Sequence, residues 1–243
     1  MSSKVQCDPA YTAKSEVRSA GRAVRPQDAA TLILVRRDAP EPKILVGKRS
    51  AGHAFMPNKF VFPGGKVDPA DSRLRPPSGL HPQVLARLMR GCSESRARAL
   101  AMAAIRETFE ETGLIVGETN SSLLKTRSRQ WRDFLQHNIN PRLDTLHYIA
   151  RAITPPYRNR RFDARFFMAD ADIIQDGEHL PQGSGELLEI HWVTLAEARQ
   201  LELPNITRIV LTEVERRLAE GHGVGEPGPF IHFRHGKPVQ DRH

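Results

Sequence analysis

The sequence predicts an α/β fold, because short apolar runs typical of buried strands alternate with segments of helical character. The run from Ala29 to Val35 is continuously apolar, as in a buried strand. The stretch from Ser95 to Ile105 is rich in Ala, Leu and Arg, which are strong helix formers. With 243 residues, 39% of them hydrophobic, the chain is long enough to bury a substantial core.

The first elements form a predicted antiparallel hairpin. Two prolines in the segment Asp38 to Pro42 prevent a strand ladder from continuing, so the run Lys43 to Arg49 is expected to return beside the first strand. A loop, Ser50 to Lys59, then leads to a short strand, Phe60 to Phe62. Arg49 ends the second strand, where it has two interpretations: a contact to a phosphate, or a solvated strand end.

The later segments continue the alternation of helices and strands. Helices are predicted where apolar residues recur on one face, and strands where apolar runs end at proline or glycine. The predicted helices are 82–89, 95–112, 130–135, 195–200 and 206–219, and the predicted strands are 146–153, 161–168 and 185–193. These elements predict a single domain at residues 28–220.

The two ends of the chain are polar and lack sustained periodicity. Residues 1–27 are predicted to be a flexible N-terminal arm, and residues 221–243, rich in Gly, Pro and His, a C-terminal tail. Four histidines stand in the tail, at positions 222, 232, 235 and 243. Their irregular spacing favours a mobile or loosely docked segment over a metal site.

The helix that ends near Gly113 carries the first functional signal. Glu107, Glu110 and Glu111 have the spacing i, i+3, i+4, which places three carboxylates on one face. Like charges at this spacing, close to the negative end of the helix dipole, are unfavourable unless something positive offsets them. A hard divalent cation such as Mg²⁺ or Mn²⁺ is the simplest candidate, and a solvated surface of glutamates is the alternative.

Two fragments of the chain together resemble the signature of the Nudix hydrolases, G-x5-E-x7-R-E-U-x-E-E-x-G-U, in which U is a bulky aliphatic residue. Matching residues are Gly65, Arg106, Glu107, Glu110, Glu111, Gly113 and Leu114. Asp71 stands in place of the first glutamate, and Thr108 in place of an aliphatic residue. The long segment Ser72 to Ile105 replaces a short spacer, so the two fragments form one site only if this segment loops out and returns. A branch of the family that includes enzymes cleaving coenzyme A has an insertion at this place.

The resemblance implies an α/β/α sandwich around a mixed β-sheet, with an inserted helical segment at about 72–94. The implied metal ligands are the Gly65 carbonyl and the three glutamates, Glu107, Glu110 and Glu111, binding Mg²⁺ or Mn²⁺. Arg106 is expected to orient Glu107 through paired hydrogen bonds. The general base stays open between Glu107, Glu110 and Glu186, and Glu186 is preferred over Glu189 as the carboxylate supplied by the later strand.

The implied reaction is hydrolysis of a diphosphate bond in a nucleoside diphosphate-linked compound. The insertion and the Arg-Phe-Asp phrase at 161–163 favour coenzyme A or an acyl-CoA, although only Arg49 and Phe60 match the fuller coenzyme A signature. Arg49 and Arg161 are the predicted substrate-binding residues. ADP-ribose, NADH and diadenosine polyphosphates remain open as substrates. Two other functions are also open: RNA 5′-pyrophosphohydrolysis, and a non-catalytic regulator that binds nucleotide.

Bulk properties limit the partners and the location. A net charge of +8 and a pI near 9.9 favour anionic partners, but the arginines are scattered, so a phosphorylated small molecule is predicted rather than nucleic acid. No apolar run is long enough to cross a membrane. With only Cys7 and Cys92, and no apolar signal segment at the start, a reducing cytoplasmic location is expected. The insertion is a candidate lid or homodimer contact, or a neutral surface elaboration.

Overall fold

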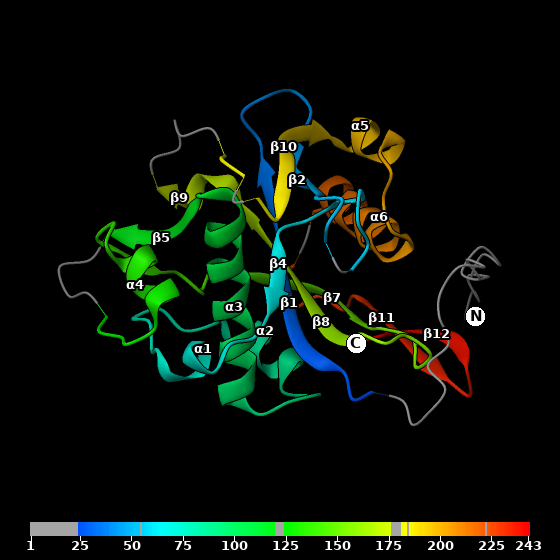
Figure 1. The fold of residues 1–243 in the computed structure, drawn as a ribbon, viewed down its shortest axis with the longest axis horizontal. Helices are drawn as coiled ribbons and strands as arrows, with labels where there is room; N and C mark the ends of the chain where they lie inside the picture. Colours follow the sequence, from blue (N-terminus) through cyan, green and yellow to red (C-terminus); the bar gives the residue numbers. More distant parts are fainter. Residues whose placement is uncertain (1–23, 54, 120–123, 176–180, 184, 222) are drawn as a thin grey trace.

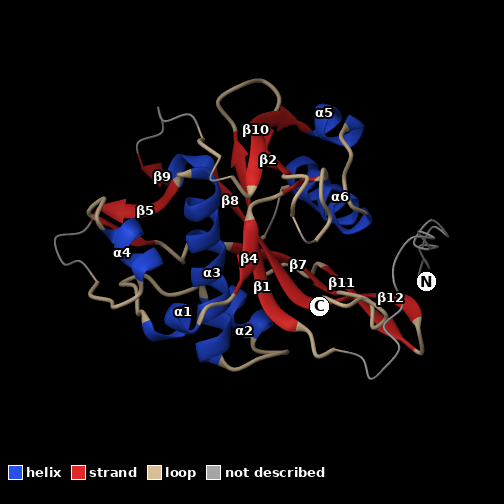
Figure 2. Cartoon of the chain, viewed as in Figure 1, coloured by secondary structure: helices blue, strands red, loops and turns tan. Residues whose placement is uncertain are grey.

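The computed structural model describes residues 24–53, 55–119, 124–175, 181–183, 185–221 and 223–243 (Figures 1 and 2). The helices are α1 (Pro69–Arg73), α2 (Pro82–Leu88), α3 (Glu94–Thr112), α4 (Arg129–Leu135), α5 (Leu195–Gln200) and α6 (Asn205–Glu220), with one 3₁₀ turn, η2 (Ala171–Ile173). The strands are β1 (Gln27–Arg36), β2 (Lys43–Arg49), β3 (Phe60–Val61), β4 (Gly64–Lys66), β5 (Ile115–Thr119), β6 (Ile139–Pro141), β7 (His147–Ile153), β8 (Phe162–Asp170), β9 (Ile174–Gln175), β10 (Leu187–Thr194), β11 (Pro229–Arg234) and β12 (Lys237–Arg242).

A nine-stranded mixed sheet organises the chain. Its order is β10-β2-β1-β8-β7-β11-β12, with β3 paired to β2 and β4 paired to β1. The pairs β1·β8 and β7·β11 are parallel, and the predicted β1·β2 hairpin is antiparallel. A separate three-stranded sheet has the order β6-β5-β9.

Helices cover both faces of the large sheet, which is why β1 is apolar at successive positions. Leu32 and Leu34 point to the core beneath α3, whereas Ile33 and Val35 point to the core beneath α6. In Figure 1, α1, α2, α3 and α4 lie on one side of β1, and α5 and α6 lie on the other. The predicted α/β/α sandwich around a mixed sheet is therefore confirmed.

Helix α3 crosses the first face and is the longest helix. Ser93 caps its start by accepting a hydrogen bond from the Arg96 backbone amide. Gly113, in the left-handed conformation at φ 73°, ends the helix, and its amide donates to the Phe109 carbonyl. Because α3 ends here, Glu107, Glu110 and Glu111 lie in its last two turns, close to β4.

Among the shortest elements, the predicted strand at Phe60 to Phe62 is present as β3, whereas α1, β4, β6 and β9 are not predicted, because two to five residues are too few to show a period. Strand β4 is the Gly64–Lys66 stretch. It pairs with β1 through Gly65 opposite Ala30, so the glycine loop is part of the sheet. Helix α1 follows at once, started by a capping box between Asp68 and Asp71.

The C-terminal segment differs from the predicted tail. Residues 229–242 form the hairpin β11–β12, and Phe230 and Ile231 of β11 lie opposite Arg151 and Ala152 in β7. The prediction of a loosely docked tail was wrong, because the apolar residues of this segment form only short runs that Gly, Pro and His interrupt. The predicted N-terminal arm lies mostly outside the described residues, and its last residue, Gln27, begins β1. His222 is outside the described residues as well.

Arginines attach the C-terminal segment to the inserted helix and to α6. Arg217 donates to the Glu226 carbonyl at 2.9 Å, and Arg87 of α2 bonds to the same carbonyl. Arg242 donates to the Pro227 carbonyl at 2.8 Å. The insertion and the C-terminal hairpin thus contact one shared backbone turn.

Replacing Ile231 by Ala is expected to destabilise the whole domain by about 2–5 kcal/mol, because Ile231 is 2% exposed and the change leaves a cavity. Denaturant unfolding of the two proteins measures the difference. Val239→Ala on the edge strand β12 is the matched control and should cost less. If Ile231→Ala lowered the free energy of unfolding no more than the control, the hairpin would not contribute to the stability of the domain.

Among the described residues, no helix combines the length and apolar character needed to cross a membrane.

Candidate active site

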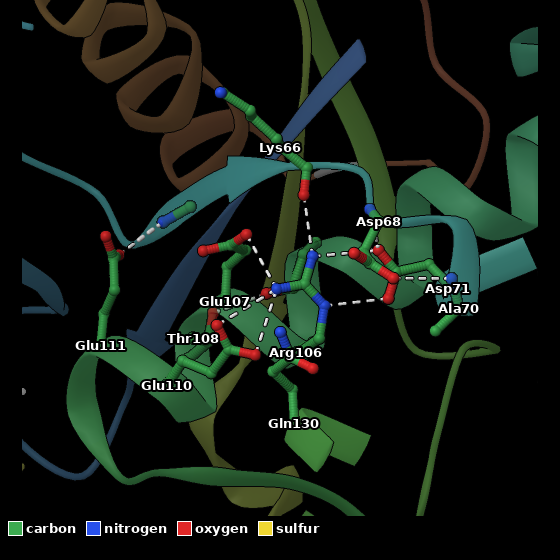
Figure 3. Close-up of polar contacts among 12 residues, drawn as sticks. Lys66, Asp68, Ala70, Asp71, Arg106, Glu107, Thr108, Glu110, Glu111 and Gln130 are labelled. Atoms are coloured by element: carbon green, nitrogen blue, oxygen red, sulfur yellow. Dashed lines mark hydrogen bonds and ion pairs between the residues drawn. The ribbon is translucent and has the colours of Figure 1, made fainter. Parts of the chain in front are cut away.

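The two fragments of the signature meet in the structure, although the insertion separates them in sequence. Arg106 on α3 donates from Nε and Nη2 to the two carboxylate oxygens of Asp71, at 2.9 and 3.0 Å. It also donates from Nη2 to the Lys66 carbonyl at 2.8 Å, just after the glycine loop (Figure 3). The segment between Asp71 and α3 therefore loops out and returns, as the sequence required.

Arg106 is 3% exposed and also holds two of the glutamates. Its Nη1 donates to Glu107 at 2.9 Å and to both oxygens of Glu110 at 3.2 Å. Burial lowers the pKa of Arg106, but the bonds to Asp71 and the neighbouring glutamates outweigh this effect and raise it overall. Arg106 is a permanent cation that contacts Glu107 through one hydrogen bond, whereas the paired bonds expected for Glu107 go to Asp71 instead.

Asp71 is fully buried and differs from a metal ligand in its surroundings. Besides Arg106, it accepts a hydrogen bond from the Trp131 indole at 2.8 Å and from the Asp68 amide at 2.7 Å. These donors occupy both carboxylate oxygens. Trp131 was not identified from the sequence as part of this site, because nothing in the short helix α4 indicates which of its apolar residues reaches Asp71.

Glu107 packs directly against the backbone of Gly65. A Cβ atom at Gly65 would lie 2.4 Å from the Glu107 carboxyl carbon, so only glycine permits this approach. Burial raises the pKa of Glu107 to about 7, with Arg106 opposing the shift and Glu110 adding to it. The arrangement brings a side-chain carboxylate and a backbone segment together at the predicted ligand positions.

Gly65→Ala is expected to push the Glu107 carboxylate aside and to weaken metal binding or activity by about 10- to 100-fold, the usual effect of disturbing the support of a ligand. Titration with Mg²⁺ and steady-state kinetics measure this loss. Gly52→Ala is the matched control, because an added Cβ there meets nothing within 4 Å. Equal behaviour of the two variants would contradict the close approach.

Glu111 is the most buried of the three glutamates, at 4% exposure, and accepts a hydrogen bond from the Gly64 amide at 2.8 Å (Figure 3). Burial raises its pKa to about 8, whereas the Gly64 bond lowers it and Glu107 raises it further. Glu110 is more open, with its side chain 32% exposed, and burial again raises its pKa. The charged form of all three glutamates is therefore disfavoured by burial.

Arg49 and Glu186 complete the charged surroundings. Arg49, the last residue of β2, interacts electrostatically with Glu111, Glu186 and Glu107, and burial lowers its pKa. Glu186 precedes β10 and is exposed, within the electrostatic range of Glu110 and Glu111. Glu189 instead pairs with Lys48 at 2.9 Å. The preference for Glu186 over Glu189 is consistent with this placement, and the catalytic role stays a prediction.

Arg161 is not brought to the glutamates. It immediately precedes β8, and its side chain donates to the backbone carbonyls of Thr154 and Val24. Both contacts hold loop backbone in place. The expected substrate contact by Arg161 has no support in this arrangement, because a basic residue beside a strand end is equally suited to bonding carbonyls.

The chemistry of the donors fits a divalent cation. Carboxylate oxygens and a nearby backbone carbonyl are the hard ligands that Mg²⁺ and Mn²⁺ prefer. Within the described part of the chain, however, no three His, Cys, Asp or Glu side chains are already gathered as around a bound metal ion. Arg106 lies between Glu107 and Glu110, so these carboxylates would have to turn towards an ion that binds beside Gly65.

Comparison with known proteins gives the same family as the motif. The model of the NUDIX domain matches residues 25–213. An acyl-coenzyme A diphosphatase, NUDT19, from Xenopus laevis is 27% identical over 206 residues, covering 64% of this chain and 53% of that protein. A putative nudix hydrolase 7 from Caenorhabditis elegans is 25% identical over 177 residues, covering 69% and 51%. The chain spans about half the length of these curated relatives.

Solved structures agree on the fold. The crystal structure of a NUDIX hydrolase from Alicyclobacillus acidocaldarius superposes with a TM-score of 0.59 at 23% identity, covering 84% of this chain and 99% of that one. The matched domain includes both halves of the signature and the paired Arg106 and Asp71. This chain belongs to the Nudix family.

Proposed function

We propose that the protein hydrolyses a diphosphate bond in a nucleoside diphosphate-linked compound, with coenzyme A or an acyl-CoA as the favoured substrate. The observation that carries the proposal is the ion pair between Arg106 and Asp71, which brings the two fragments of the signature together. As a result, three buried or half-buried glutamates lie beside Gly64 and Gly65. The named activity of the Xenopus laevis relative supports the choice of coenzyme A.

In this proposal, Glu107, Glu110, Glu111 and the Gly65 carbonyl hold Mg²⁺ or Mn²⁺. The bound ion would offset the charge of the diphosphate oxygens and lower the pKa of a water molecule. Arg106 keeps the carboxylates oriented through its bonds to Glu107 and Glu110. Arg49 binds a phosphate oxygen of the substrate, because it ends β2 and interacts electrostatically with Glu111, Glu186 and Glu107. Glu107, Glu110 or Glu186 takes the proton of the attacking water.

The direct test is a substrate panel with purified protein in Mg²⁺ or Mn²⁺. Coenzyme A, an acyl-CoA, ADP-ribose, NADH and a diadenosine polyphosphate are compared with 5′-triphosphorylated RNA. The proposal predicts cleavage of coenzyme A or its acyl derivative to a 3′,5′-ADP-like product and a phosphorylated remainder. Preferred turnover of the RNA, or binding without turnover of any compound, would overturn it.

The raised pKa values predict how metal-free protein responds to pH. Folding raises the pKa of Glu107 to about 7 and of Glu111 to about 8, from 4.5, so the folded state binds more protons than the unfolded state in this window. Stability without metal should therefore fall as the pH rises from about 4.5 to about 8. Because Mg²⁺ would replace those protons, the rise in Tm that it produces should grow across the same window. Thermal unfolding with EDTA and with Mg²⁺ measures both, and a rise in Tm that does not change with pH would contradict the assignment.

A further inference from the structure

The loop between β2 and β3 is a closed loop with no regular secondary structure at its described positions. The Arg49 amide donates to the Lys59 carbonyl at 3.0 Å, and the Asn58 amide donates to the Arg49 carbonyl at 3.1 Å, which closes the base. The backbone of Arg49 therefore closes the loop, and its side chain is the cation that interacts with Glu107, Glu111 and Glu186. Contacts inside the loop decide where its guanidinium lies.

His53 is the loop side chain that contacts Arg49. Its Nε2 lies 2.8 Å from Arg49 Nη1, and its Nδ1 lies 3.0 Å from the same atom. The Nδ1 atom is also 2.8 Å from the Phe55 carbonyl oxygen and 3.1 Å from the Phe55 amide. One imidazole thus connects the loop backbone to the arginine.

The contacts show what each group can do in the hydrogen bond. A guanidinium only donates hydrogen bonds, so a ring nitrogen that meets it is an acceptor. The Arg49 Nη1 atom lies within 3.0 Å of both ring nitrogens of His53, so it approaches the ring between them. The Nδ1 atom faces both a donor, the Phe55 amide, and an acceptor, the Phe55 carbonyl. In either tautomer, therefore, one ring nitrogen can accept from Arg49 while Nδ1 bonds to the Phe55 backbone.

Arg49 still has donors to offer. Its Nε is buried and has no hydrogen-bond partner among the described residues. A long side chain with several rotatable bonds loses conformational freedom when it binds a phosphate, and a neighbour that fixes it beforehand reduces that loss. The acceptor nitrogen of His53 is placed to do this.

We propose that His53 is a positioning residue, which accepts a hydrogen bond from Arg49 and holds the guanidinium ready for an oxygen of the substrate diphosphate. The inference rests on the proposed function, since it assigns a support to the arginine of the same site. The competing explanation is that His53 only fastens the loop through Phe55. The two differ in whether the effect of His53 passes through Arg49.

A double-mutant cycle separates them, using kcat and KM for the best substrate of the panel. His53→Ala should lower kcat/KM by about 10- to 100-fold, mainly by raising KM, as expected for loss of a hydrogen bond to a charged group. His53→Gln, whose amide oxygen can accept from Arg49, should recover part of it. In an Arg49→Ala background, His53→Ala should have almost no further effect. Equal losses in both backgrounds would overturn the inference. His191→Ala, on the exposed side of β10, is the control.

An NMR measurement tests the contact without turnover. The ¹⁵N shifts of the two His53 ring nitrogens, both of which lie within 3.0 Å of Arg49 Nη1, should change in Arg49→Ala. The His191 nitrogens should stay the same. Unchanged His53 shifts in Arg49→Ala would overturn the inference even if the protein is an active hydrolase. If no compound in the panel is hydrolysed, the proposed function fails and these shifts alone test the contact.

Discussion

Glu111→Gln is expected to lower kcat/KM by at least about 100-fold while making metal-free protein more stable at alkaline pH. The loss follows from removing a charged ligand of the proposed metal, where even indirect disturbance costs about 10- to 100-fold in affinity. The gain follows from burial, which raises the pKa of Glu111 to about 8, so its charge is unfavourable above that pH. A glutamine oxygen can still accept the bond from the Gly64 amide.

The size of the stability change depends on pH. Near pH 5 Glu111 is protonated in the folded protein, so the parent and Glu111→Gln should have similar Tm values. Above about pH 8 the parent buries a charge and the variant does not, and each kcal/mol gained should raise Tm by about 2–4 °C. Thermal unfolding in EDTA across this range, with kinetics in Mg²⁺, measures both effects.

Glu189→Gln is the matched control, because Glu189 lies on β10 in an exposed pair with Lys48. Such a pair contributes little, so the control should keep its activity and its Tm. If Glu111→Gln hydrolysed the substrate as fast as the parent, the carboxylate would not be a ligand. If it lost activity by unfolding, the proposed benefit of removing the charge would be wrong.

Much of the fold could be predicted, because the long helices and strands show a clear pattern of apolar residues or a clear stop residue in the sequence. The continuous apolar run of β1 reflects two covered faces, and Gly113 ends α3 at the predicted residue. The C-terminal hairpin could not be predicted in the same way. Its β11 strand has two buried residues, Pro229 and Ile231, and its pairing with the distant β7 has no local signal.

In the candidate site, too, residues of one helix could be grouped from the sequence, whereas contacts between separate elements could not. Glu107, Glu110 and Glu111 could be grouped from helical spacing alone, since periodicity fixes which residues share a face. The contacts that cross between elements could not. The hydrogen bond from Trp131 to Asp71 joins residues 60 positions apart, and the His53 contact depends on the conformation of an irregular loop. Arg161 was predicted as a substrate contact from the Arg-Phe-Asp phrase, and its side chain bonds to the backbone carbonyls of Thr154 and Val24, which the phrase does not indicate.

Asp71→Ala is expected to cost about 3–5 kcal/mol, the usual effect of leaving one partner of a buried ion pair without the other. Asp71 is fully buried and Arg106 is 3% exposed, so neither group can turn to water. For a domain of this size the loss corresponds to a fall in Tm of about 6–20 °C. Asp144→Ala is the matched control, because Asp144 pairs with Arg142 at 3.1 Å on the surface and should cost less than about 1 kcal/mol.

Asp71 also affects the site, because it binds two of the donors of Arg106. In Asp71→Ala these donors are released, and the guanidinium is free to interact more strongly with Glu107 and Glu110, which Nη1 already contacts. Carboxylates held by Arg106 are less available to a cation, so Mg²⁺ affinity should fall even at temperatures where the variant is folded. Trp131→Phe removes the indole bond to Asp71 together with part of a fully buried ring system; the lost bond should cost about 1–3 kcal/mol, with Mg²⁺ affinity nearly kept. A folded Asp71→Ala that binds Mg²⁺ as tightly as the parent would show that the ion pair supports the fold alone.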